Sequence, residues 1–446
     1  MKRTQSTENR LPDSREHGQI SRRSFMQTML MSGFGLSRLN GLGTVRSFSA
    51  QVSRPLSVAY QDWITPLHPG IFDVHAAFPD LLFLNEIPNF ADAQNGSSPW
   101  DIYVGVTPFA DIAALVESGV IEPWDDYIPA EIIEDIIPSI REEGSIDGKL
   151  YSWPFLVDVV VQSYNANVIT RAGLADMPPT TWDEYLDNAS AVVESGAAPI
   201  GCSFDPNGWR SLVAIAHTFS TDVYYTLEGD TTPLFDFTHP AAIQALEVMK
   251  QMLVHSTMPT ANGSQYVSDE QVFESQAVGY YVTDHNAPLR FANLWDDPSA
   301  LRLAAIPSGG TNSTVFWTTG ACLFKNGQNK EIAAAYMQSL TYDERIWRDS
   351  IAGTETLHTG QLPPYQSLYA VWEENPPEWL LSNPWVELVR EQIEVAKAIP
   401  NHTFGVRQFV IAKPHWENYL LGSESDPLVA MQAAKDAVVA AIQREG

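Results

Sequence analysis

One carboxylate interrupts an apolar stretch near the middle of the chain. Asp158 lies in the run from Tyr151 to Tyr164, which is rich in Val, Phe and Tyr and is bounded by turn residues. Such a run is typical of one or two extended segments. A carboxylate in these surroundings must be solvated, paired or bound to a ligand. We therefore expect Asp158 to contact a ligand or to hold a structural hydrogen bond.

Other carboxylates leave acid–base chemistry open as an alternative. Asp125, Asp126, Asp205 and Asp158 are of the residue type that a glycosidase uses, but such an enzyme needs two carboxyl groups close together. In a chain this acidic, neighbouring acids are usually solvated. The sequence contains no GxSxG, HExxH, CxxC or GxxxxGK[ST] motif, and its ten histidines show no metal-ligand spacing. We expect a protein that is not an enzyme and has no metal or cofactor.

Aromatic residues point to another kind of chemistry. The chain has 13 Trp and 16 Tyr, and the flat C–H faces of sugars stack on such rings while sugar hydroxyls bind Asp, Asn, Glu and Arg. Most Trp side chains nevertheless pack in cores. The pairs Tyr224-Tyr225 and Tyr280-Tyr281 keep a ferric-ion site as an alternative, because phenolates are hard donors. Neighbouring strand residues point to opposite faces, so each pair is expected to bury one ring.

Strands and helices alternate along the chain, which predicts a parallel sheet covered by helices. Strands are expected at 56–60, 81–85, 101–104, 199–204, 277–282, 301–306 and 315–324, and helices at 108–118, 182–195, 209–220, 240–255, 330–340 and 427–444. Thr181 and Glu184 form a capping box before the helix at Trp182. In open α/β sheets, ligands bind beyond the carboxyl ends of strands. Trp63, Thr107 and Phe109 follow the first and third strands and are therefore ligand candidates.

A continuous block around this region carries a family resemblance. DGKLYSWPF, SYNANVITRAGL and PPTTWDEYLDNA, between residues 147 and 189, resemble the central block of the extracellular solute-binding proteins of ABC transporters, the family that includes maltose-binding protein. The segments SGVIEPWDDYI, FESQAVGYYVTDHNA, AAIPSGG and FWTTGACLFKNGQNKEIAAAYMQSLT fit the same family. The resemblance covers the chain from about residue 56 to its C-terminus.

The resemblance implies an α/β fold of the type II periplasmic-binding-protein kind, with two discontinuous α/β lobes, a hinge and a cleft between the lobes. It implies an N-terminal lobe of residues 51–158 and 283–341 and a C-terminal lobe of residues 159–282 and 342–446. A protein of this family captures a small solute, here expected to be a sugar or oligosaccharide, by lobe closure and delivers it to ABC permease subunits. A monomer is expected.

The resemblance also implies ligand contacts. Asp158 falls where the chain crosses between lobes, and Asn207 and Trp209 fall in a cleft loop, although Asn207 is also a turn former. At Asp284 and His285 the chain departs from a Gly-Asp-Trp-like segment of many relatives, and at Trp317 and Thr318 bulky residues replace glycines of the family's cleft strand. The full set of candidates in these later regions is Asp158, Asn207, Trp209, Asp284, His285, Trp317 and Thr318, with Tyr365 and His358 as weaker ones.

The N-terminus resembles an export signal. Ser21-Arg22-Arg23-Ser24-Phe25-Met26 is similar to the twin-arginine consensus and is followed by an uncharged stretch that ends at Arg38. That stretch is too short to span a bilayer, and small residues before Ala50 suit cleavage. Residues 1–50 are expected to be a signal peptide of a periplasmic or secreted protein, with membrane anchoring as the alternative if cleavage does not occur.

The overall charge excludes several partners. Residues 1–50 hold eight of the 26 Lys and Arg and three of the 54 Asp and Glu, so the remainder has 18 basic and 51 acidic residues and a net charge of −33. Such a protein repels nucleic acid and anionic membranes. Cys202 and Cys322 are the only cysteines, and neither adjoins the leader. We expect both to be small buried hydrophobic residues.

Overall fold

The computed structural model describes residues 55–445 except 69, 79, 207, 261–262, 267–268 and 354–358. The expected leader, Asn207 and His358 lie outside the described residues. Ten of the described strands form one sheet with the order β2-β1-β3-β15-β7-β13-β8, in which β14 also pairs with β7, and β4 and β16 pair with β15. These strands are β1 (Ser57–Tyr60), β2 (Leu82–Asn85), β3 (Ile102–Val106), β4 (Ile121–Glu122), β7 (Trp153–Asn165), β8 (Ile200–Ser203), β13 (Val278–Asp284), β14 (Leu301–Ala304), β15 (Val315–Phe324) and β16 (Lys397–Ala398).

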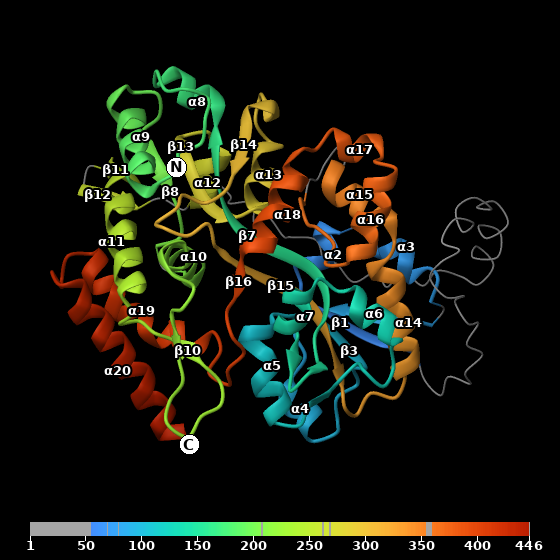
Figure 1. The fold of residues 1–446 in the computed structure, drawn as a ribbon. Coiled ribbons are helices and arrows are strands. Elements are labelled where there is room, and N and C mark those ends of the chain that lie inside the picture. The colour runs from blue at the N-terminus through green and yellow to red at the C-terminus, as the bar shows by residue number, and fades with distance from the viewer. Residues whose placement is uncertain are drawn as a thin grey trace, which may run out of the picture. The chain divides into compact units, whose positions relative to one another are not determined.

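Helices cover this sheet, and three short hairpins stand apart from it (Figure 1). The hairpins pair β5 (Ser145–Ile146) with β6 (Lys149–Leu150), β9 (Tyr224–Tyr225) with β10 (Leu234–Phe235), and β11 (Thr257–Thr260) with β12 (Gly263–Tyr266). The helices up to β13 are α2 (Ile64–Leu67), α3 (Ile71–His75), α4 (Phe90–Gln94), α5 (Pro108–Glu117), α6 (Ala130–Asp135), α7 (Pro138–Glu143), α8 (Ala166–Arg171), α9 (Trp182–Glu194), α10 (Trp209–Phe219), α11 (Pro240–His255) and α12 (Asp269–Glu274). Those that follow are α13 (Asn286–Ala292), a 3-10 turn at Pro298–Ala300, α14 (Lys330–Thr341), α15 (Glu344–Ala352), α16 (Gln366–Glu374), α17 (Glu378–Leu381), α18 (Trp385–Val395), α19 (Arg407–Leu420) and α20 (Pro427–Glu445).

Local sequence signals explain many of these boundaries. The turn between β5 and β6 has Asp147 and Gly148 at φ values of 52° and 74°, which is the left-handed region that Gly and Asp tolerate. The Thr181 hydroxyl accepts a hydrogen bond from the backbone N–H of Glu184 and caps α9. The Glu184 carboxylate accepts in return from the N–H of Thr180, one residue earlier than in a standard capping box.

The central strand β7 belongs to two parts of the sheet. Its first half pairs antiparallel with β15, where Asp158 lies opposite Trp317. Its second half pairs with β13 and β14, where Val160 lies opposite Asp284. Figure 1 shows β7 passing from the part of the fold with β15 and α7 to the part with β13 and α8. The expected extended run is therefore one fully buried strand that crosses between two lobes.

Packed cores define these two lobes. One core contains residues of β1, β3 and the first half of β7, together with α14. The other contains residues of α9, α10, α11, α19 and α20. Side chains from Ile346 to Ala396 join the first core, whereas the expected division placed 342–396 in the C-terminal lobe. Ala287, Phe291 and Ala292 of α13 pack with β8 and β13, although 283–300 was expected in the N-terminal lobe. The large aromatic and aliphatic side chains of these segments decide where they pack.

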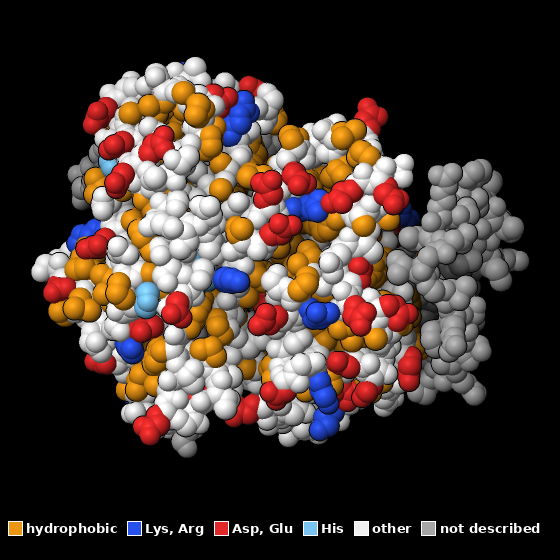
Figure 2. All heavy atoms as spheres, viewed as in Figure 1, with side chains coloured by type: hydrophobic (Ala, Val, Ile, Leu, Met, Phe, Trp, Pro, Cys, Tyr) orange, Lys and Arg blue, Asp and Glu red, His pale blue; other side chains and the backbone are white. Residues whose placement is uncertain are grey.

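The surface and the cysteines follow the composition. Asp and Glu outnumber Lys and Arg on the face in Figure 2. Cys202 and Cys322 are both free and buried, as expected, and they lie in different hydrophobic clusters. No helix in the part of the chain that the structure describes has the length and apolar character that a membrane span requires.

Candidate functional site

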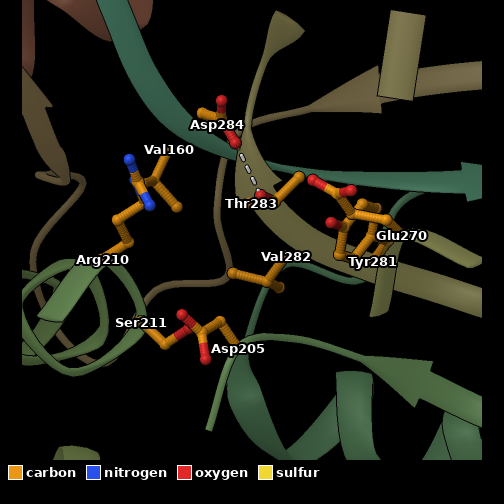
Figure 3. Close-up of a pocket in the computed structure, with 9 residues that line it drawn as sticks. All are labelled: Val160, Asp205, Arg210, Ser211, Glu270, Tyr281, Val282, Thr283 and Asp284. Carbon is orange, nitrogen blue, oxygen red and sulfur yellow. Dashed lines mark hydrogen bonds between the residues drawn. The ribbon is translucent and has the colours of Figure 1, made fainter. Parts of the chain in front are cut away.

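A small pocket of about 150 Å³ opens at the ends of two parallel strands. β8 and β13 run parallel, and the pocket lies where both end, beside the first turn of α10. Carboxyl ends of parallel strands are the usual place for ligands in α/β folds. The pocket is lined by Val160, Asp205, Arg210, Ser211, Glu270, Tyr281, Val282, Thr283 and Asp284 (Figure 3).

The loop from β8 to α10 brings a carboxylate and a guanidinium to this pocket. Asp205 follows β8, and its carboxylate occupies the space that a Cβ at Gly208 would need, at 2.0 Å. Gly208 therefore lets the Asp205 side chain fold back against the loop. Arg210 extends from α10, and in Figure 3 its guanidinium points toward Val160 and the end of the pocket where Asp284 lies. Hydroxyl groups of Ser211 and Thr283 complete a polar lining, and the Thr283 hydroxyl donates to Asp284 Oδ1 at 2.7 Å.

Asp158 lies next to the pocket and is 4% exposed. Its Oδ1 accepts from Asn286 Nδ2 at 2.5 Å and from Gln361 Nε2 at 3.0 Å. The same Asn286 amide donates to Asp284 Oδ2 at 2.8 Å, so one side chain bridges two carboxylates. Burial, followed by the charge of Asp284, raises the pKa of Asp158 well above its ordinary value. The structural hydrogen bonds are thus present, and Val160, two residues along the same strand face, lines the pocket.

An aromatic cluster closes one side of this region. The ring of Trp209 meets Phe109 at 4.7 Å and Trp317 at 5.0 Å between centroids, both edge to face. The Arg210 guanidinium lies over Trp209 and Trp317, 5.2 and 5.1 Å from their ring centroids. Such cation–π contacts hold an arginine in a fixed direction. Trp209 is half-buried, whereas Phe109 and Trp317 are buried.

The family of the chain can be decided by comparison with known proteins. A family model described as bacterial extracellular solute-binding protein matches residues 90–349, which is more than half of the chain. The chain belongs to this family. The resemblance read from the sequence is thereby confirmed.

Individual relatives agree with this assignment. A protein of Brucella abortus described only as a binding protein is 26% identical over 287 residues, which cover 58% of this chain and 66% of the relative, just under two thirds of its length. A maltotriose-binding protein of Pyrococcus abyssi is 25% identical over 206 residues, or 46% of this chain and 42% of the relative. Both are binding proteins.

A solved structure supports the fold class. An ABC transporter solute-binding protein of Thermotoga lettingae, bound with α-D-tagatose, superposes with a TM-score of 0.70 at 18% identity, covering 86% of this chain and 99% of that chain. The predicted fold class, a type II periplasmic-binding-protein-like α/β arrangement, is confirmed. At this identity the comparison concerns the fold alone.

Several expected contact residues of this solute-binding chain lie together. Trp209, Asp284 and Asp158 line or adjoin the pocket, and Phe109 and Trp317 pack against Trp209. Phe109 and Trp317 expose 1% and 4% of their surface, so in this conformation their rings are packed into protein. Their ligand role remains a prediction.

Trp63 and Thr107 lie at strand ends of the first lobe. Trp63 is half-buried at the start of α2 and packs against the first core. Thr107 precedes α5, where its hydroxyl makes no capping hydrogen bond. Its backbone N–H donates to the Asp111 carboxylate at 2.8 Å. Neither residue is among those that line the pocket in the described part of the chain.

Three further candidates, His285, Tyr365 and Thr318, have polar atoms that are hydrogen-bonded to other groups of the protein. Both ring nitrogens of the fully buried His285 are used: Nδ1 accepts from the N–H of Val159 at 3.3 Å, and Nε2 donates to the Gly360 carbonyl at 2.9 Å. Burial lowers the pKa of His285 to about 4, so its ring is neutral at neutral pH. The Tyr365 hydroxyl donates to the Pro154 carbonyl at 2.8 Å. These bonds argue against the ligand contacts expected of His285 and Tyr365.

Thr318 is bound in the same way. Its N–H donates to Glu143 Oε1 at 3.1 Å and its hydroxyl to Oε2 at 2.7 Å. Glu143 is 5% exposed, and burial raises its pKa to about 8. The pair joins α7 to the strand β15 that neighbours the crossing, so Thr318 holds the hinge region together and does not face the pocket.

The ferric-ion alternative depends on the surroundings of its two tyrosine pairs. In that part of the chain, no group of three or more His, Cys, Asp and Glu side chains is placed to hold a metal ion. Tyr280 and Tyr281 are both buried, in two different hydrophobic clusters, rather than one buried and one exposed. The Tyr224 hydroxyl lies 2.9 Å from His217 Nε2.

Some pocket residues escaped the sequence reasoning. Arg210, Ser211 and Thr283 were not among the candidates, although Arg210 directly follows Trp209, Thr283 directly precedes Asp284, and Ser211 is two positions after Trp209. A signal existed, because side chains just beyond strand ends and in the first turn of the next helix share the ligand edge of the sheet. Glu270 of α12 comes from a helix outside these loops, and its position gave no such signal.

Proposed function

We propose that this protein is an extracytoplasmic receptor that captures a small solute, a sugar or oligosaccharide, by lobe closure and delivers it to an ABC permease. The observation that carries the proposal is the polar pocket at the carboxyl ends of β8 and β13, beside the strand β7 that joins the lobes. Its hydroxyls, carboxylates and guanidinium are the groups that bind sugar hydroxyls. The maltotriose-binding relative supports a sugar ligand.

The ligand contacts that we propose come from both sides of the crossing. Asp284, Arg210, Asp205 and Trp209 supply the second lobe's contacts, and Trp63 with Thr107 supplies the first lobe's edge when the lobes close. Closure shifts a population between open and closed states, because the ligand binds only where both edges meet. Asp158, through its hydrogen bonds with Asn286 and Gln361, links the strand that crosses between the lobes to segments that move on closure.

A sugar panel tests the function directly. Purified protein lacking residues 1–50 is mixed with mono- and oligosaccharides, including tagatose and maltotriose, and unfolding temperatures are recorded. A ligand raises the unfolding temperature in proportion to its occupancy, and calorimetry then gives the stoichiometry. We expect binding of one ligand per chain with the sugar recovered unchanged. Release of a cleaved product contradicts a receptor and favours a glycosidase, and no binding by any sugar rejects the proposed ligand class.

We propose further that the protein is exported by the twin-arginine route and acts as a monomer with its permease. Arg22→Lys together with Arg23→Lys should keep the precursor inside the cell, because the pathway reads the arginine pair. Conversion of Arg38 to Lys is the matched control and should leave export unchanged. Light scattering of the purified protein should give the mass of one chain, and loss of sugar uptake on deletion of the gene tests delivery to the permease.

A further inference from the structure

The pocket holds more carboxyl groups than cations. Asp205, Glu270 and Asp284 line it, while Arg210 is the one basic residue among its described lining residues. Glu270 also lies 3.9 Å from Arg290, but both side chains are partly exposed and such a pair is weak. A group that enters this pocket therefore meets an excess of negative charge.

A further carboxyl group, that of Asp158, lies at the hinge beside the pocket. Asp158 and Asp284 share the Asn286 amide, a neutral donor that neutralises neither carboxylate. The cation that faces them is Arg210, whose guanidinium is held over Trp209 and Trp317. Burial and the Asp284 charge raise the pKa of Asp158, and the hydrogen bonds from Asn286 and Gln361, followed by the Arg210 charge, offset this only in part. Positive charge is thus scarce around these two acids.

The geometry favours an organic cation over a metal ion. The carboxylates come from three elements, the β8–α10 loop, α12 and β13, and in the described residues they do not gather into a metal-binding group. Carboxylates spread around a pocket of about 150 Å³ suit a ring-sized molecule that carries hydroxyls and one ammonium group.

Building on the function proposed above, we propose that the pocket selects a solute with a positive charge: an amino sugar, or an oligosaccharide with one amino-substituted ring. One of two carboxylates that lie at opposite ends of the pocket, Asp284 or Asp205 (Figure 3), binds the ammonium group, and Ser211, Thr283 and Arg210 bind ring hydroxyls. An acidic sugar is repelled by the same carboxylates. A neutral sugar forms the hydroxyl contacts but lacks the charge-assisted bond.

Matched sugars that differ only at one substituent test this selection. Calorimetry on the protein without residues 1–50 compares glucosamine, N-acetylglucosamine, glucose and glucuronate, and the corresponding galacto and manno series. We expect the amine of at least one series to bind at least about tenfold more tightly than its neutral partners, the gain typical of a charge-assisted hydrogen bond. The uronate of that series should bind most weakly.

Variants connect the preference to the pocket. Asp284→Asn keeps the shape and the acceptor oxygen but removes the charge, so the preference for the amine should fall to within about threefold. Asp205→Asn is a second, independent variant from another loop, in case the first fails to fold as judged by its unfolding temperature. Glu378→Gln, an exposed change on α17, alters the net charge equally and should keep the full preference.

The outcomes separate this inference from the proposed function. Equal binding of amine and neutral sugar, tighter binding of the uronate, or an unchanged preference in both Asp variants overturns the charge selection while the receptor function stands. Failure of every sugar to bind, including tagatose and maltotriose, overturns both.

Discussion

The ring of Phe109 lies edge-on against the ring of Trp209, with 4.7 Å between the ring centroids. Phe109 lies in the first turn of α5, next to the first lobe's strands, yet it is buried in the cluster of the second lobe. The pair thus joins α5 to the core of the second lobe. The contact therefore couples the packing of the two lobes.

A double-mutant cycle should detect this coupling. We expect Phe109→Leu and Trp209→Leu to show an interaction free energy of about 1 kcal/mol in urea unfolding, because edge-to-face pairs contribute roughly 0.5–1.5 kcal/mol beyond their buried area. Phe109→Leu combined with Trp379→Leu, a half-buried Trp of the first core, should be additive. Additivity in both cycles would show that the rings do not stabilise each other.

Stability should depend on pH through Glu143. The buried Glu143 has its pKa raised from 4.5 to about 8, so its contribution to stability is complete below pH 4.5 and is lost as the pH rises through 8. Glu143→Gln keeps an acceptor for the Thr318 N–H and removes this loss. Relative to the wild type, we expect the variant to gain up to about 1.4 kcal/mol per pH unit across this window.

Urea unfolding at pH 5, 6, 7 and 8 measures this gain. Glu142→Gln changes the exposed neighbour on the same helix and, as the matched control, should not reproduce the gain of Glu143→Gln. A flat difference for Glu143→Gln would mean that Glu143 titrates normally in the folded protein.

Substitutions at Asp158 should separate its structural bonds from its charge. Asp158→Ala leaves the buried amides of Asn286 and Gln361 without their acceptor, at a cost of roughly 1–3 kcal/mol for each unsatisfied group. Asp158→Asn retains an acceptor oxygen and should cost clearly less. Because burial raises the Asp158 pKa, the free energy of unfolding of the wild type falls as the pH rises above 3.8. The stability of the Asn variant relative to the wild type should therefore be higher near neutral pH than in acid. Equal stability of the Ala and Asn variants would exclude a bonding role.

The elements were largely predictable, because their signals are local. The helix at 240–255 and the strand at 315–324 have the expected bounds, and the helix expected at 108–118 ends beside Gly119, whose φ of 68° suits a residue after a helix. Apolar periodicity, Pro at helix starts and Gly at helix ends are properties of neighbouring residues, and they need no tertiary information.

The site was less predictable, because it depends on distant pairs. Asp158 accepts a hydrogen bond from Gln361, 203 positions away. Both ring nitrogens of His285 are hydrogen-bonded to backbone groups, of Val159 and Gly360. Sequence places a polar residue near a strand end but does not show whether another segment already binds its atoms. The same limit applies to the expected lobe division, because the buried aromatics of 342–396 suit either lobe until their packing partners are known, and in the structure they pack in the first core.

Trp63 provides the sharpest test of a first-lobe contact. It is half-buried at the start of α2, beyond the end of β1, at the edge from which we propose the first lobe's contact with the ligand. Trp63→Ala should lower the affinity for the bound sugar at least about tenfold, since an aromatic face contributes of order 1 kcal/mol or more to stacking. Stability should change by no more than about 2 kcal/mol, the range of ordinary substitutions. Trp379→Ala is the matched control, because it removes a half-buried Trp of the same core away from the pocket. Affinities are measured by calorimetry with the same sugar. Equal affinities of the two variants would mean that Trp63 only packs in the core and that Thr107 is the remaining candidate for the first lobe's contact.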